Sequence, residues 1–71
     1  MMTLEGLRIM RELQRNGQPL PPFWLEEARH YLGLKRRAVR KFGRVWDREQ
    51  LQEAESLLKT MLTDMGGYAN G

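Results

Sequence analysis

Residues 25–43 read LEEARHYLGLKRRAVRKFG and carry the sharpest pattern in the chain. A first amphipathic segment runs to Gly33, and a second segment with a strongly basic side follows it. On a helix with 100° per residue, the apolar side chains of Ala38, Val39 and Phe42 fall on one side, and the arginines and lysines fall on the other. This separation predicts a short helix with one side in the core and one side free.

The positive charge is concentrated around this segment. The chain has 12 lysines and arginines against 9 aspartates and glutamates, for a net charge of +3. Residues 1–34 are balanced, residues 35–44 carry six basic residues and no acid, and residues 45–71 have a net charge of −3. A focused basic patch beside a neutral or acidic body predicts an anionic partner.

Length and composition indicate one small helical domain. A chain of 71 residues buries only about 60% of its unfolded surface, so dimerisation would add stability. The absence of cysteine excludes disulfides and thiolate metal sites. No apolar run approaches the length of a membrane span. We expect a cytoplasmic protein, no membrane association, a single domain over residues 1–65 and a disordered tail over residues 66–71.

The sequence predicts an all-α fold with four helices. The first extends from an N-cap at Thr3 to about Asn16, and the second begins at Pro22 and ends at a glycine cap, Gly33. The basic helix covers residues 35–42. Helices two and three are expected in helix-turn-helix geometry.

Asp47 and Gln50 match a capping box, which predicts that a long last helix begins near Arg48. This helix is expected to end at Met65, before two glycines.

The last helix carries an apolar stripe with two interpretations. Its members recur at helical spacing and can close the core over the other helices. The same stripe can instead pair with a second copy or with a helix of a partner protein. The residues predicted for such an interface are Trp46, Leu51, Leu58, Met61 and Met65.

Catalysis and metal binding are not expected. The single histidine, His30, and the single serine, Ser56, have no matching partners in the sequence. Glu26 and Glu27 are adjacent, so they point about 100° apart on a helix and do not converge on one site. No phosphate-binding glycine loop or metal-ligand spacing is present, and no cofactor is expected.

Three motifs around the central glycine resemble the helix-turn-helix of small phage and plasmid regulators of the excisionase and MerR-like group. These motifs are Glu26-Glu27-Ala28, Leu32-Gly33-Leu34 and Arg36-Arg37-Ala38-Val39. The resemblance implies a small DNA-binding transcriptional regulator from a phage or mobile element, whose basic helix enters or borders the major groove of double-stranded DNA.

The residues predicted to contact DNA are Lys35, Arg36, Arg37, Arg40, Lys41 and Arg44. Six neutralised phosphates would give a log–log salt slope of about −5. A homodimer is a further expected assembly. The alternative function is a helical regulator that binds a host protein such as RNA polymerase or a transcription factor. Its anchors would be Trp24, Tyr31, Trp46 or the apolar stripe.

Overall fold

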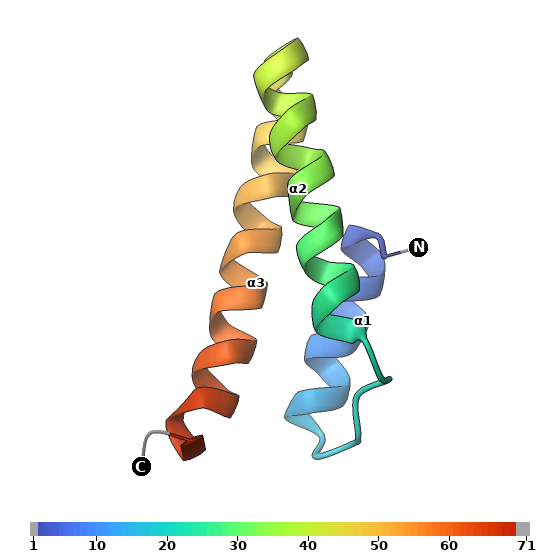
Figure 1. Cartoon of the computed structure of the whole chain (residues 1–71), viewed down its shortest axis with the longest axis vertical. Coiled ribbons are helices and arrows are strands. Elements are labelled where there is room, and N and C mark those ends of the chain that lie inside the picture. The colour runs from blue at the N-terminus through green and yellow to red at the C-terminus, as the bar shows by residue number, and fades with distance from the viewer. Residues whose placement is uncertain (1, 70–71) are drawn as a thin grey trace.

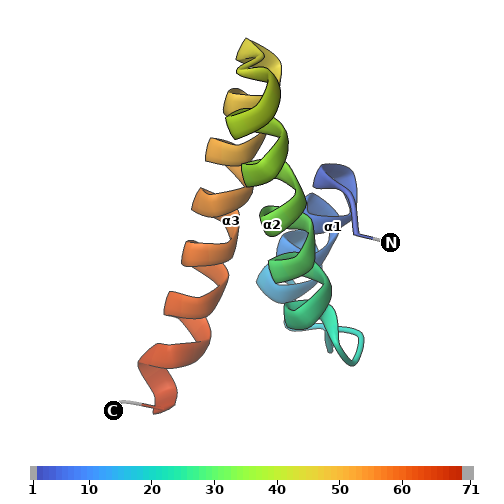
Figure 2. The same ribbon diagram turned by 45° about the horizontal axis from the view of Figure 1, so that its top comes forward.

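Residues 2–69, the part of the chain that the computed structural model describes, form three α-helices and no strand (Figure 1). Side chains are described for residues 2–65. Helix α1 spans Leu4–Arg15, α2 spans Trp24–Phe42 and α3 spans Val45–Ala69. Helices α2 and α3 form a long antiparallel hairpin (Figures 1 and 2). Helix α1 lies beside the half of this hairpin that is farther from the α2–α3 connection. The all-helical prediction is confirmed, and the prediction of four helices is wrong.

Helix α1 begins at its predicted cap. Thr3 has an extended backbone, and its Oγ1 accepts a hydrogen bond from the Gly6 amide at 3.0 Å. This bond satisfies one of the amides that have no partner within the helix. The helix ends at Arg15, with Asn16 as its C-cap, which agrees with the predicted boundary.

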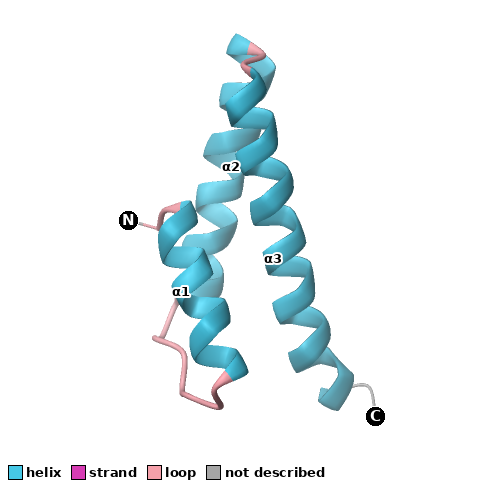
Figure 3. Ribbon diagram, turned by 180° about the vertical axis from the view of Figure 1, so that it is seen from behind, coloured by secondary structure: helices cyan, strands magenta, loops and turns pink. Residues whose placement is uncertain are grey.

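The connection from α1 to α2 ends in an unusual backbone conformation. Phe23 has a φ of 65°, in the left-handed region that side chains other than glycine rarely adopt, and α2 begins at the next residue, Trp24. Pro22 therefore precedes α2 and is not its first helical residue. Figure 3 shows the connection from α1 to α2 as a loop. Glu26 and Glu27 occupy the first turn of α2, where the helix dipole favours negative charge.

Gly33, predicted to end a helix, lies inside α2. Its φ is not positive, so it makes no left-handed cap, and the predicted helix-turn-helix turn is absent. The unbroken helix places Ala28, Leu32 and Lys35 on one stripe along α3. Ala28 and Leu32 are buried there. A new helix starting after Gly33 would need a side-chain oxygen at Lys35 to cap its amides. The lysine side chain has hydrogen-bond donors only, so it cannot serve as this cap.

Helix α3 is longer than predicted at both ends. It begins at Val45, because the Arg48 amide already donates to the carbonyl of Arg44 at 3.2 Å. Asp47 therefore lies in the first turn and is not the N-cap. The helix continues to Ala69, beyond the end predicted at Met65. Of the predicted disordered tail, residues 70–71 lie outside the described residues, and the single domain over residues 1–65 stays a prediction.

The core is small and lies mainly where all three helices meet. Leu7 of α1 and Met61 of α3 are fully buried. Ala28 and Ala54, also fully buried, let α2 and α3 approach closely because their side chains are short. The remaining buried apolar residues are Met2, Trp24, Leu32 and Leu58.

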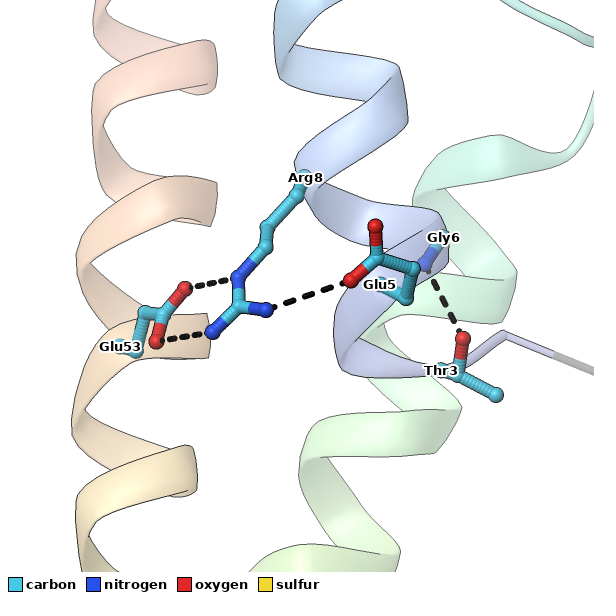
Figure 4. Close-up of polar contacts among 5 residues, drawn as sticks. All are labelled: Thr3, Glu5, Gly6, Arg8 and Glu53. Atoms are coloured by element: carbon cyan, nitrogen blue, oxygen red, sulfur yellow. Dashed lines mark hydrogen bonds and ion pairs between the residues drawn. The ribbon is translucent and has the colours of Figure 1, made fainter.

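Polar contacts join α1 to α3. Arg8 donates two hydrogen bonds to Glu53, at 2.5 and 2.8 Å, and a third to Glu5 at 3.3 Å (Figure 4). Arg11 forms an ion pair with Asp64 at 2.6 Å. The hydrogen bond from Arg8 lowers the pKa of Glu53 below its usual value.

The short length of α1 leaves the far part of the hairpin uncovered. Helix α1 has 12 residues, whereas α2 has 19 and α3 has 25. At about 1.5 Å per residue, α1 extends for about half the length of α3. Large apolar side chains near the α2–α3 connection are consequently exposed, among them Phe42 and Trp46.

None of the helices in the described residues combines the length and apolar character needed to cross a membrane.

We expect Gly33→Ala to raise the free energy of unfolding by about 0.5–1 kcal/mol, because alanine loses less backbone entropy in a helix. A methyl group at this position meets no atom within 4 Å. Urea unfolding monitored by circular dichroism measures the change. Gly43→Ala is the control, and it should lower stability by about 1 kcal/mol because Gly43 has a φ of 64°. Destabilisation by Gly33→Ala would contradict the continuous helix.

A second prediction concerns Glu53→Gln. Because the folded-state pKa of Glu53 is lowered, its ion pair stabilises the protein above the unfolded pKa of about 4.3 and is lost as pH falls through the folded value. The stability advantage of the wild type over Glu53→Gln should therefore be largest above about pH 5 and shrink in more acidic solution. Urea unfolding of both proteins between pH 3 and pH 7 tests this, and a pH-independent difference would contradict it.

Candidate nucleic-acid interface

We define the hairpin tip as residues 36–48, which contain the end of α2, the connection and the start of α3. Two residues, Gly43 and Arg44, separate the helices. Gly43 has a φ of 64°, and its amide donates to the carbonyl of Val39 at 2.8 Å, which ends α2. Glycine suits this left-handed position because it has no Cβ. The tight connection brings the basic end of α2 next to the first turn of α3.

A half-buried polar cluster fixes the base of the tip. Asp47 is only 6% exposed. The ammonium of Lys35 donates to Asp47 Oδ1 at 3.0 Å and to Gln50 Oε1 at 2.6 Å. This arrangement compensates the buried carboxylate, and the first turn of α3 adds a favourable dipole. Lys35, predicted to contact DNA, is instead a brace between α2 and α3.

Arg36 is also held within the protein. Its Nη2 lies 3.1 Å from Glu55 Oε2 on α3, with both side chains about half exposed. Exposed pairs of this kind contribute little to stability and exchange readily with solvent. Arg36 is therefore partly neutralised but not buried.

The other predicted cations remain exposed. Arg37, Arg40 and Lys41 on α2, and Arg44 in the connection, are all exposed. Among the described residues, none of these four forms an ion pair with a carboxylate within 4.0 Å. Arg48 on α3 shares both properties and was missed by the sequence analysis. Arg48 follows Arg44 by four residues, a spacing that puts both on one side of a helix. This spacing was overlooked because the last helix was expected to begin only after Asp47.

Aromatic side chains lie among these cations. Phe42 is 55% exposed and Trp46 is 59% exposed. The guanidinium of Arg44 lies 4.6 Å from the ring centre of Phe42 and 5.6 Å from that of Trp46, and the ammonium of Lys41 lies 5.5 Å from the Phe42 ring. These are cation–π distances. The apolar side of the basic segment was predicted to lie in the core, and this is wrong. Ala38 and Val39 are only half-buried outside the core cluster and Phe42 is exposed, because α1 does not extend to this part of the hairpin.

Trp46 also borders an open groove above the start of α1. The groove is lined in part by Leu4 and Tyr31 and by three carboxylates, Glu5, Glu49 and Glu53. Arg8 and Lys35 line the groove as well, and Arg8 pairs with both Glu5 and Glu53, so the charges of the groove are largely compensated within the protein. An anionic ligand is therefore favoured at the tip, where Arg37, Arg40 and Lys41 have no carboxylate partner among the described residues.

The predicted interface residues on α3 do not form one surface. Leu58 and Met61 are buried in the core of the protein itself, at 7% and 0% exposure, so neither can contact a partner in this conformation. Leu51 is half-buried, and Met65 is 45% exposed at the other end of the hairpin from Trp46. The interpretation that this stripe closes the core fits its middle part.

Within the described residues, no group of three or more histidine, aspartate or glutamate side chains is placed to hold a metal ion. Comparisons with protein-family models, with curated proteins and with solved structures find no match to this chain.

We expect Asp47→Ala to lower the free energy of unfolding by about 2–3 kcal/mol, because it leaves the half-buried ammonium of Lys35 without its carboxylate. The matched control is Glu55→Ala, which removes the exposed partner of Arg36 and should cost less than about 1 kcal/mol. Urea unfolding of both variants gives the comparison. Equal losses would show that the Lys35–Asp47 contact does not brace the hairpin.

Proposed function

We propose that this protein is a small DNA-binding regulator that contacts double-stranded DNA through the hairpin tip. The observation that supports the proposal is that only some of the basic residues around the tip are neutralised by carboxylates of the protein. Lys35 and Arg36 have carboxylate partners within the protein, whereas Arg37, Arg40 and Lys41 are exposed without one. Unneutralised cations gathered on one protruding element are an electrostatic footprint for nucleic acid.

The mode of binding differs from that implied by the helix-turn-helix resemblance. Because α2 is continuous, no separate helix crosses the DNA backbone to place a recognition helix. The exposed cations of the tip are arginines and a lysine, which suit phosphate oxygens. Asparagine and glutamine, which read adenine, are absent from residues 36–48. Binding is therefore proposed to be strongly salt-dependent with modest sequence preference. The role in transcription rests on the sequence resemblance alone.

The alternative function, binding of a host protein, is favoured by the exposed rings of Phe42 and Trp46, since aromatic residues dominate interface energetics. An acidic surface on a partner protein would satisfy the same cations. The experiment on DNA binding therefore includes an acidic polypeptide.

Fluorescence anisotropy with a labelled 20-base-pair duplex tests the proposal. Five phosphate contacts, one for each unpaired cation in residues 37–48, give a log–log salt slope of about −4.5. The double variant Arg37→Ala/Arg40→Ala should reduce the slope to about −3 and weaken binding at low salt.

The matched control is Arg29→Ala/Lys59→Ala, which removes two exposed positive charges outside the tip and should keep the wild-type slope. A slope near zero, or an equal loss in the control, would overturn the proposal. Binding to poly-glutamate without binding to DNA would favour the alternative function.

A further inference from the structure

The exposed aromatic rings of the tip are not explained by phosphate binding. Phe42 ends α2 and Trp46 lies in the first turn of α3, so the two rings flank the two-residue connection. Both rings are more than half exposed, and both contact Arg44. A planar cationic group therefore already lies against them in the free protein. A flat aromatic surface beside unpaired cations matches the chemistry of a nucleobase attached to its phosphate.

The contacts of Arg44 do not close this surface. An exposed cation–π contact favours the stacked state by about two- to fivefold. Stacking of a base on an aromatic side chain contributes about five- to 150-fold for each base. Because Arg44 is exposed and lies in the connection, its side chain is free to leave the rings and pair with a phosphate. A base can then occupy the surface that Arg44 covers.

Only some nucleic acids can offer such a base. In a fully paired duplex each base is stacked between its neighbours, so its flat faces are unavailable to a side chain. Unpaired bases at a gap, a fork or a single strand can stack on an aromatic ring without this loss.

We infer that the preferred ligand of the hairpin tip is DNA with unpaired bases, which stack on Phe42 and Trp46 while the arginines and lysine of the tip hold the adjacent phosphates. This inference rests on the proposed DNA-binding function and names its substrate class.

The test compares three labelled DNAs of equal length by fluorescence anisotropy at one salt concentration: a full duplex, the same duplex with a central gap of six unpaired nucleotides, and a single strand. The wild type should bind the gapped DNA at least about tenfold more tightly than the duplex. Phe42→Ala/Trp46→Ala should abolish this preference and change duplex affinity by less than about threefold. Since both rings are exposed, circular dichroism should show an unchanged fold.

Two further variants separate stacking from other effects. Trp46→Phe keeps an aromatic ring and should keep the preference for the gap. Phe23→Ala removes an aromatic ring that is 69% exposed outside the tip, and it should bind all three DNAs as the wild type does. Intrinsic tryptophan fluorescence should be quenched by the gapped DNA in the wild type and less in Trp46→Phe.

The outcomes distinguish the two proposals. Salt-dependent binding to the duplex without preference for unpaired bases would overturn the inference and leave the DNA-binding function standing. A preference that survives in Phe42→Ala/Trp46→Ala would also overturn it. Failure to bind any of the three DNAs would overturn both proposals.

Discussion

The contact between the Lys35 ammonium and the buried Asp47 carboxylate sets the arrangement of the hairpin. The two groups lie 3.0 Å apart across α2 and α3, with Gln50 as a further acceptor. The buried carboxylate of Asp47, a residue that is 6% exposed, requires a partner. The uninterrupted course of α2 from the buried Leu32 into its basic end brings Lys35 to it. The continuity of α2, the start of α3 and the orientation of the tip are all consistent with this one contact.

The same contact divides the basic residues into two groups with different roles. Lys35 and Arg36 are occupied by Asp47 and Glu55, so they join the two helices. The cations farther along α2, Arg37, Arg40 and Lys41, form no ion pair with a described acidic residue. A charge count over residues 35–44 treats all six cations as equal, whereas the structure leaves four of them without an ionic partner among the described residues.

Local patterns in the sequence predicted the features that depend on local interactions. The Thr3 cap and the end of the basic segment at Phe42 were predicted correctly, because a helix end is fixed by a side chain or a backbone conformation within a few residues. Gly33 was misinterpreted because the same residue type can end a helix or lie inside one. The choice depends on packing against α3, which sequence periodicity over a short segment does not reveal. Asp47 likewise matched a cap, although its partner Lys35 lies 12 residues earlier.

Because α1 packs against only one part of the hairpin, the residues that form the core and the residues proposed to bind a ligand lie in different parts of the molecule. The largest fully buried side chains, Leu7 and Met61, lie where α1 and α3 are joined. The tip extends past the N-terminal end of α1, and most of its residues are exposed. The exposed side chains of the tip, unlike the buried Asp47 and the left-handed Gly43, can therefore be exchanged during evolution at little cost to the core. One helical scaffold of this kind could acquire different ligands through changes confined to those exposed positions.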